Sequence, residues 1–407
     1  MSRVLVDSGI DWIGKIPANW NIQPLGLYLK ERKEKVSDID YEPLSVTKNG
    51  IVPQLENAAK SDAHDQRKKV CKFDFVINSR SDRKQSCGLS YLEGSVSLIN
   101  TVLKIYNYYP EYIKYALDNN MFSEEFYRNG HGIVADLWTT KYSEMKHIRI
   151  PEPNYDEQKN IANFLDKQST KIDEIINDNN REVELLEEYK RTILKNELGN
   201  KVGSKKYRIK NIANLKGRIG WQGLTTADYI EEGPYLITGV DFNESKGSIN
   251  WESCVHISEE RYEEAPEIHV LPNDLLITKD GTIGKLAIIS ENREASLNSG
   301  VMLIRIKDKS VCNVKYLYYL LKSDYFWDWY NSSQRGSSTI KHLYQEQFYN
   351  FSFFLPDLAH QEKVIKKIDD QFFKLDQVIN YRKQIIEKLE EYKRSLIYEC
   401  VTGKREV

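Results

Sequence analysis

Apolar residues recur at alternating steps of three and four over two long stretches of this chain. One series runs from Ile161 to Ile193 and the other from Val364 to Leu396, and neither contains proline or glycine. This spacing places the apolar side chains on one face of an α-helix and is typical of the seam of a coiled coil. At a rise of ~1.5 Å per residue, a helix over the 38 residues from Glu157 to Leu194 makes a rod of roughly 57 Å. The pattern therefore predicts two long helices, each with one apolar stripe to bury.

The two stretches are copies of one another. Glu157 to Leu194 aligns without a gap on His360 to Ile397 at a constant offset of 203, and each copy ends in Glu-Glu-Tyr-Lys-Arg. A repeat of this length predicts a pseudo-twofold molecule. We expect the helices to pair antiparallel, because a whole domain separates them, through the seam residues Ile161, Leu165, Ile172, Leu186, Val364, Ile368, Leu375 and Leu389. The alternative is two ordinary amphipathic helices, each packed into a separate core.

The segments before the two helices also correspond, more faintly. Within residues 20–150 and 204–355, Asp74 to Asn78 matches Asp274 to Thr278, each a short apolar strand led by an acidic turn residue. The predicted fold class is therefore α+β, with two similar strand-rich globular domains separated by two long antiparallel helices.

Each of these domains is predicted to hold one short helix near its end. The helix starts at Tyr112 in the first domain and at Tyr316 in the second, and it is expected to run to about Phe126 and Tyr330. A glycine-containing loop and an apolar-proline step follow before each long helix.

The loops that follow the matched strands differ sharply. Ser79 to Gln85 has little in common with Lys279 to Lys285 beyond polarity and basic charge. Because loops carry recognition while scaffolds carry position, this favours one mechanical role with two specificities.

Charge is distributed unevenly along the chain. The net charge of -2 by itself argues against nucleic-acid binding. However, basic residues gather in residues 204–218 and 67–84, while acids gather in 259–267. Local basic faces can follow a phosphate backbone whatever the total charge is, although a single basic run is usually just a solvated face.

Composition also excludes several classes of protein. No run approaches the ~20 apolar residues that span a bilayer, and the first residues lack the apolar core of a signal peptide. We therefore expect a soluble, cytoplasmic protein with no membrane contact. The five cysteines are scattered without a Cys-x-x-Cys pair, so we expect reduced, mostly buried thiols.

No catalytic motif is found. Gly281 to Lys285 is too short for a phosphate-binding loop, and the chain has no Pro-Pro for an adenine methyltransferase pocket. The seven histidines show no helical pairing for a metal. The sequence predicts neither catalytic residues nor a metal site.

Three features together resemble the specificity subunit of type I restriction-modification systems. They are the opening Trp12-Ile13-Gly14-Lys15-Ile16-Pro17, the Asp274 to Thr278 strand followed by Gly281 and Gly284, and the twin helices, each entered through proline and then glutamine. The resemblance covers nearly the whole chain. The stretch Ser79 to Gln85 departs from it, because it lacks the Gly-x-x-Gly pattern.

The resemblance implies an organisation into five parts. These are an N-terminal segment at 1–19, target-recognition domains at 20–152 and 204–355, and long helices at 153–203 and 356–407. Each domain is expected to read one half of a bipartite site in double-stranded DNA, while the helices set the spacer and dock two modification subunits. The chain itself would hold no cofactor. S-adenosylmethionine, ATP and Mg would belong to the modification and restriction subunits.

Candidate DNA-contacting residues follow from the chemistry of base edges, which Arg, Lys, Asn and Gln recognise through paired hydrogen bonds. The candidates are Arg80, Arg83, Lys84, His131, Trp138, Lys216, Arg218, Trp221, Gln222, Lys279, Lys285, Arg335, Ser337 and Lys341. For each residue a plain surface or phosphate role is an open alternative. Two domains on one DNA face are expected to read half-sites ~10 base pairs apart.

Two other functions compete with this reading. A coiled-coil scaffold with two protein-binding heads explains the helices and the divergent loops, but not the basic stretches or the Trp-Ile-Gly opening. A self-contained modification enzyme is disfavoured by the missing cofactor loop and the missing Pro-Pro pocket.

Overall fold

The computed structural model describes residues 3–55, 65–132, 138–199, 203–218, 224–333 and 341–407. The chain divides into two compact units. Unit 1 comprises Met1–Asn180 together with Arg382–Val407, and unit 2 comprises Arg181–Tyr381. Each unit thus contains one strand-rich domain and a part of both long helices. The predicted five-part division remains a prediction.

Unit 1 contains short strands followed by helices. Its strands are β1 (Leu5–Asp7), β2 (Lys15–Pro17), β3 (Asn21–Pro24), β4 (Leu29–Glu31), β5 (Lys35–Val36), β6 (Leu44–Thr47), β7 (Gly50–Pro53), β8 (Arg67–Val70), β9 (Phe75–Asn78), β10 (Cys87–Leu89), β11 (Gly94–Val96), β12 (Asn100–Ile105) and β13 (Arg149–Glu152). Its short helices are α1 (Pro110–Leu117), α2 (Asn120–Arg128) and α3 (Tyr142–Met145). The long helix α4 (Tyr155–Leu198) begins here and continues into unit 2.

Unit 2 repeats this order. Its strands are β14 (Lys205–Arg208), β15 (Ala213–Gly217), β16 (Ile230–Ile237), β17 (Phe242–Asn243), β18 (Ser248–Ile249), β19 (Val255–His256), β20 (Leu275–Thr278), β21 (Leu286–Ile288), β22 (Ala295–Leu297), β23 (Val301–Ile306) and β24 (Ser352–Leu355). Its short helices are α5 (Ile209–Ile212), α6 (Glu259–Glu263), α7 (Val314–Lys322), α8 (Asp324–Ser333) and α9 (Gln345–Phe348). The second long helix, α10 (Leu358–Val401), begins in unit 2 and ends in unit 1.

The central sheet is the same in both units. It is antiparallel, with the order β10-β9-β12-β4 in unit 1 and β21-β20-β23-β15 in unit 2. Phe75 lies opposite Leu103 in the first sheet, and Leu275 lies opposite Ile304 in the second. The match between the two apolar strands that was predicted from the sequence therefore holds at the level of strand register.

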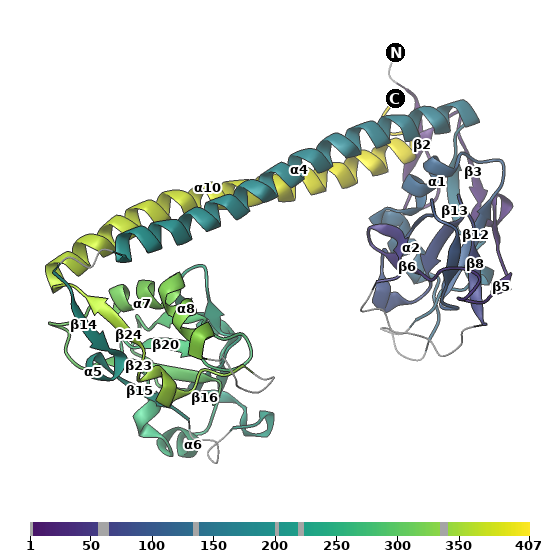
Figure 1. The fold of residues 1–407 in the computed structure, drawn as a ribbon. Coiled ribbons are helices and arrows are strands. Elements are labelled where there is room, and N and C mark those ends of the chain that lie inside the picture. The colour runs from purple at the N-terminus through teal and green to yellow at the C-terminus, as the bar shows by residue number, and fades with distance from the viewer. Residues whose placement is uncertain (1–2, 56–64, 133–137, 200–202, 219–223, 334–340) are drawn as a thin grey trace. The chain divides into compact units, whose positions relative to one another are not determined.

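Successive side chains of these strands point to opposite faces of the sheet, so they contribute to two cores, one on each face. In unit 1, Phe75 and Ile77 join the core shared with α1, α2 and the long helices, while Val76 joins a smaller cluster on the other face. In unit 2, Leu275 and Leu276 divide in the same way between its two larger clusters. In Figure 1, α7 and α8 of unit 2 lie beside β20, as this division requires.

The single short helix predicted in each domain is wrong, because each is broken into two. In unit 1 the break falls at Asp118 and Asn119, where the Asn119 side chain accepts a hydrogen bond from the Phe122 amide and so begins α2. Asparagine is a favoured N-cap because its side chain satisfies an amide that the new helix leaves unpaired. In unit 2 the break falls at Ser323.

The repeated glutamine anchors the start of each long helix. Gln158 donates to the Pro153 carbonyl at 2.8 Å and accepts from the Tyr109 amide at 2.8 Å, just before α1. Gln361 donates to the Pro356 carbonyl at 2.8 Å and accepts from the Asn313 amide at 2.9 Å, just before α7. The proline-glutamine entry noted in the sequence is therefore a clamp between the long helix and the short helix of its own unit.

The long helices run antiparallel and pack together, which confirms the predicted fold class. In unit 1 the Lys393 ammonium lies 2.7 Å from the Asp173 carboxylate, and Arg382 donates to the Asn179 amide oxygen at 3.2 Å. In unit 2 Lys190 pairs with Asp376. The Lys190 pair reproduces the Lys393 pair at the offset of the repeat. In each unit α4 and α10 lie side by side (Figure 1).

The N-terminal segment belongs to the core of unit 1. Trp12, Ile13 and Trp20 are buried in the same cluster as Leu396 and Val401 near the end of α10. The Ile13 carbonyl accepts hydrogen bonds from the Tyr398 hydroxyl at 3.0 Å and the Lys404 ammonium at 2.8 Å. The Trp-Ile-Gly opening therefore packs the start of the chain against its last helix.

Candidate nucleic-acid interface

In unit 1 the loop after β9 is fixed by its backbone. Asn78, the last residue of β9, accepts the Arg80 amide on its side chain at 3.0 Å. Ser81 donates to the Trp138 carbonyl at 2.9 Å, and Thr140 donates to the Ser79 carbonyl at 2.9 Å. The structure thus brings together Arg80 and Trp138, two of the residues predicted from the sequence.

The charged side chains of this loop are partly neutralised by acids. Arg80 lies 3.3 Å from the Asp82 carboxylate, and Lys84 lies 3.0 Å from that of Glu124. Arg83 is farther from Asp82, at 3.9 Å, and its side chain is 70% exposed. A hollow of about 540 Å³ opens beside the loop, lined by Ser81, Asp82, Lys84, Tyr127, Arg128 and Trp138. His131, also predicted, is exposed at the neighbouring turn and pairs with Thr139 through the backbone.

Unit 2 builds the equivalent loop on glycines. The Lys279 carbonyl accepts from the Leu343 amide at 3.0 Å, which repeats the junction between Ser79 and Thr140 in unit 1. Gly284 has φ of 88°, and a Cβ there would lie 2.4 Å from the Trp327 ring. Only glycine suits this position, because the conformation is left-handed and the ring leaves no space. This explains the second glycine of the Gly-x-x-Gly pattern; the first, Gly281, also has a left-handed φ, of 64°, but open space around it.

One predicted basic residue of this second loop, Lys285, borders a smaller hollow. Lys285 lies 3.3 Å from the Glu244 carboxylate. The hollow, of about 320 Å³, is lined by Thr238, Val240, Asp280, Thr282, Lys285 and Asn298. Val240 was not among the sequence candidates, yet it is 82% exposed.

Among the remaining candidates, Lys216 is exposed on β15. Lys341 is exposed beside the second loop, two residues before Leu343, whose amide donates to the Lys279 carbonyl. Arg218 is only 2% exposed, and its guanidinium donates to the Leu297 carbonyl at 2.8 Å and the Ser296 hydroxyl at 2.9 Å. This geometry fits an internal tie of the domain rather than a surface contact. Four further candidates lie outside the described residues: Trp221, Gln222, Arg335 and Ser337.

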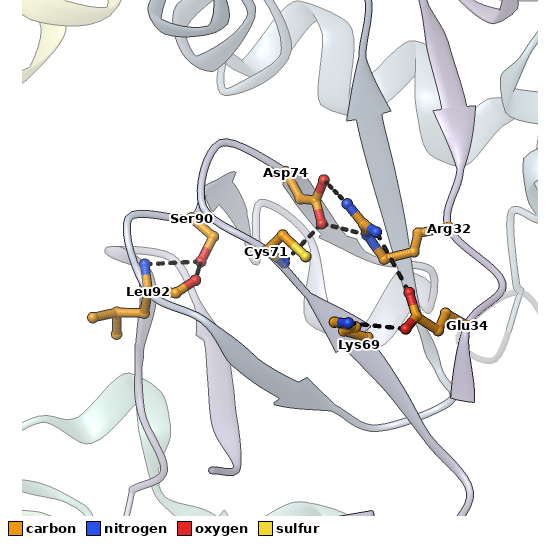
Figure 2. Close-up of polar contacts among 7 residues, drawn as sticks. All are labelled: Arg32, Glu34, Lys69, Cys71, Asp74, Ser90 and Leu92. Carbon is orange, nitrogen blue, oxygen red and sulfur yellow. Dashed lines mark hydrogen bonds and ion pairs between the residues drawn. The ribbon is translucent and has the colours of Figure 1, made fainter. Parts of the chain in front are cut away.

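Much of the basic stretch 67–84 also serves the interior. Arg67 is 7% exposed and donates to the Ser95 hydroxyl at 2.8 Å, and burial lowers the pKa of its guanidinium. Lys69 lies 2.9 Å from the Glu34 carboxylate, and this hydrogen bond lowers the pKa of Glu34 (Figure 2). Counting basic residues along the sequence therefore overestimated the basic surface of this segment.

Asp74, the acidic turn residue before β9, organises the polar contacts around it. It accepts from Arg32 at 2.7 and 3.0 Å and from the Cys71 amide at 2.8 Å (Figure 2). The carboxylate is 5% exposed, and its hydrogen bond raises the pKa of Arg32. Asp74 is thus a buried residue that holds the turn before β9, the strand that leads into the loop Ser79 to Gln85.

The seam residues of the long helices divide between the two units. In unit 1, Ile161, Leu165 and Ile172 are buried in the core, and Leu389 is partly buried against it. In unit 2, Val364 and Ile368 are buried and Leu375 is partly buried. Leu186 is half-buried. These cores also contain residues of the globular domains, so the apolar stripe packs on its own domain as well as along the other helix.

Four residues of the apolar series predicted to form the seam stay exposed, contrary to that prediction, at positions that the repeat makes equivalent. Ile175 and Val378 are 47% and 43% exposed, and Tyr189 and Tyr392 are 53% and 49% exposed. Unit 1 therefore carries Ile175 and Tyr392, and unit 2 carries Val378 and Tyr189. The contacts of Asp173 and of Asp376 place the two members of each set at similar heights along the antiparallel pair. Each unit thus exposes an aliphatic residue and a tyrosine in the same arrangement.

Within the described residues, no helix is long and apolar enough to cross a membrane. Four of the five cysteines are buried and Cys71 is half-buried, all as free thiols, as predicted.

Comparisons with known proteins point in one direction. Residues 201–391 match the family model of the type I restriction modification DNA specificity domain. A type I restriction enzyme MjaX specificity subunit of Methanocaldococcus jannaschii is 22% identical over 96% of this chain and 95% of its own length. The resemblance inferred from the sequence is confirmed.

Two solved structures are also similar. A chain from a structure of a type I R-M system superposes with a TM-score of 0.71 at 14% identity, covering 96% of this chain and 99% of that one, which shows the shared fold. The HsdS subunit from Thermoanaerobacter tengcongensis gives a TM-score of 0.46 at 14% identity, over 96% and 98% of the two chains.

Proposed function

We propose that this chain is the DNA-specificity subunit of a type I restriction-modification system, in which the globular domain of each unit reads one half of a bipartite duplex site. The observation that carries the proposal is that the two units share the same central sheet, loop junction and glutamine contacts. The family match covers residues 201–391. Unit 1 repeats the sheet register, the loop junction and the glutamine clamp of that matched region. One recognised specificity domain thus becomes two.

The two domains differ where they would meet DNA. Unit 1 presents Arg80, Arg83 and Lys84 beside Trp138, and unit 2 presents Lys285 beside Val240 on a glycine loop. Because base edges are distinguished by donors, acceptors and methyl groups, unlike loops read unlike sequences. The two half-sites therefore differ from each other. A protein-binding scaffold is not favoured, because the matched family is defined by DNA specificity.

The exposed apolar residues on the helices suit two copies of one partner. Solvent-exposed aromatic and aliphatic side chains at repeat-equivalent positions form two similar docking patches. We assign them to two modification subunits, which would bring S-adenosylmethionine. Restriction subunits would add ATP- and Mg-dependent cleavage, so this chain contributes recognition and no reaction of its own. Such a complex would work in the cytoplasm, where it meets DNA.

Domain exchange tests the recognition role. The chain is produced together with its modification subunits, and methylated adenines are mapped by single-molecule sequencing. The expected result is a split motif that disappears without this chain. Replacing residues 20–152 by the corresponding domain of a relative should change one half of the motif and leave the other half intact. Simultaneous change of both halves would show that the domains do not read independently.

Helix length tests the spacer. Removing seven residues, one heptad, from both α4 and α10 keeps the seam on the same face. The unread spacer should then change while each half-sequence is kept. An unchanged spacer contradicts a role of the helices in setting it.

Single substitutions test the docking patches. Tyr189→Ser and Tyr392→Ser each remove one exposed ring from one of the two patches. Each should lower binding of one modification subunit and leave the other bound, as measured by native mass spectrometry. The matched control is Tyr381→Ser, because Tyr381 is 62% exposed on α10 but its repeat equivalent is Asp178. If the control weakens assembly as much as Tyr392→Ser does, the docking assignment is wrong.

A further inference from the structure

The turn before β12 exposes two aliphatic side chains beside the recognition loop of unit 1. Leu98 and Ile99 are 46% and 43% exposed. Their position is fixed, because the Asn100 amide donates to the Ser97 carbonyl at 3.0 Å and the Ser79 amide donates to the Ile99 carbonyl at 3.2 Å. The turn is thus tied by its backbone to the start of the loop that carries Arg80.

This turn lies in a basic hollow. Leu98 and Ile99 line a hollow of about 570 Å³ together with four lysines, Lys33, Lys68, Lys141 and Lys146. Among the described residues of the lining, the one carboxylate is that of Glu31, which already lies 3.3 Å from the Lys68 ammonium. The nearby Glu144 carboxylate accepts the Lys141 amide at 2.8 Å at the start of α3. The hollow therefore combines two apolar side chains with an excess of positive charge.

Duplex DNA is the ligand that matches both properties. Lysines hold phosphates without regard to sequence, and they position a protein on the double helix. Exposed aliphatic side chains contribute nothing to phosphate binding, but they do contact the 5-methyl group of thymine, the apolar feature of the major groove. The hollow also adjoins the loop hollow lined by Trp138, because Thr139 and Ser79 border the first while Trp138 and Ser81 border the second.

We propose that Leu98 and Ile99 read thymine methyl groups in the half-site of unit 1, while the surrounding lysines hold the flanking phosphates. This proposal rests on the proposed function and makes it specific. The equivalent turn of unit 2 carries Ser299 and Gly300, and the Gly300 carbonyl accepts from the Lys279 amide at 2.8 Å in the same way. The two domains thus share the turn and differ in its chemistry.

Uracil substitution isolates the methyl group. Deoxyuridine pairs like thymine but lacks the 5-methyl, so each thymine in the mapped motif is replaced singly in a synthetic duplex. Methylation rates are measured with the complex of this chain and its modification subunits. With the wild-type chain, at least one replacement in the unit 1 half-site should slow methylation about 3- to 10-fold. With Leu98→Ser/Ile99→Ser the thymine and uracil duplexes should react equally.

Two controls accompany this comparison. Tyr106→Ser removes another exposed apolar side chain just beyond β12, 49% exposed, and should keep the wild-type ratio of thymine to uracil rates. Reading of the unit 2 half-site by the double variant reports that the chain is folded and assembled. If the ratio of thymine to uracil rates is the same in the wild type and the double variant, or if no thymine of the unit 1 half-site is sensitive, the methyl-reading proposal is overturned.

The lysines have a separate signature. Lys141→Gln and Lys146→Gln should weaken binding to all duplexes alike and reduce the slope of log affinity against log salt by about 0.9 each. An unchanged salt slope would assign the hollow to something other than DNA and overturn the proposal. Failure of the proposed function itself looks different, since no split motif would then be methylated by any variant.

Discussion

The two globular domains hold the same buried carboxylate with arginines from different strands. Asp74 before β9 and Asp274 before β20 occupy equivalent places in the sheet register. Asp74 is met by Arg32, just after β4, whereas Asp274 is met at 2.6 and 2.8 Å by Arg305 on β23. The register places Lys216 where unit 1 has Arg32, and Lys104 where unit 2 has Arg305. Arginine and lysine have changed places between neighbouring strands.

A buried serine in each domain also accepts a hydrogen bond from an arginine that comes from a different strand in each case. The Ser95 hydroxyl accepts from Arg67 on β8 at 2.8 Å, and the Ser296 hydroxyl accepts from Arg218 after β15 at 2.9 Å. In both cases the acceptor occupies an equivalent position in the two domains, while the arginine that donates to it comes from different strands. The domains therefore keep their polar contacts while the sequences diverge. Even strand direction varies around the frame, since β11 pairs antiparallel with β8 but β22 pairs parallel with β16.

The largest effect is expected from removing the shared carboxylate. Asp74→Ala removes two hydrogen bonds of Arg32, 12% exposed, and leaves it the Glu34 carboxylate at 3.7 Å. It should cost about 3 kcal/mol in the free energy of unfolding of unit 1, the low end for a broken buried ion pair. Asp274→Ala should cost clearly less, because the Arg305 side chain is 34% exposed and can turn toward water. Urea titration with hydrogen exchange of peptides from each unit measures both. Equal losses would show that the two pairs are energetically alike despite their different burial.

A pH effect of intermediate size is expected in unit 1 alone. Burial raises the pKa of Asp118 to about 6, and the Cys87 thiol lies 3.6 Å from its carboxylate. Because an unfolded aspartate has a pKa of ~3.9, the folded state binds the proton more readily. Stability should therefore rise as the pH falls from 6 to 4 and be lost as the pH rises through 6, by at most about 2 to 3 kcal/mol.

Asp118→Asn supplies the control for this pH effect. It should flatten the pH profile of unit 1 and leave that of unit 2 unchanged, because the sequence match places Lys322 at the corresponding position. Urea titrations of both proteins at pH 4.5 and pH 7 measure the difference. A variant that keeps the wild-type profile would assign the proton uptake to another group.

The smallest effect tests the exchange of arginine itself. Arg32→Lys loses a two-point contact that lysine cannot reproduce, and should cost about 1 to 2 kcal/mol. Adding Lys104→Arg gives unit 1 the arrangement of unit 2 and should recover about half of that loss. The reciprocal pair is Arg305→Lys with Lys216→Arg. If the double variants are as unstable as the two single losses added together, the strands do not share one acceptor site.

The sequence predicted the parts of the fold that repeat. The offset of 203 identified the long helices, and its matched charges proved to be matched contacts, as at Asp173 with Lys393 and Lys190 with Asp376. Asp74 and Asp274 were recognised as equivalent turn residues. Their buried ion pairs were not, because the partners sit at different sequence positions in the two domains, and only strand pairing brings them close.

The site was less predictable than the frame. Helix periodicity did not reveal the break at Asp118, since a cap depends on one side chain rather than on a pattern. Charge along the sequence did not distinguish the buried Arg218 from the exposed Lys216 two residues earlier. The search for hydrogen-bonding residues passed over Leu98, Ile99 and Val240, because an aliphatic residue in a loop becomes informative only when its exposure is known.

The interleaving of the two units has a consequence for synthesis on the ribosome. Unit 2 is continuous, Arg181–Tyr381, whereas unit 1 is completed by Arg382–Val407. Although the first residues of unit 1 are synthesised first, Trp12 and Ile13 cannot be fully buried until Leu396 and Val401 have been synthesised. Unit 2 can therefore reach its native state first, while unit 1 waits until residues 382–407 leave the ribosome. A premature stop codon ahead of Leu396 and Val401 would accordingly harm the domain that is made first.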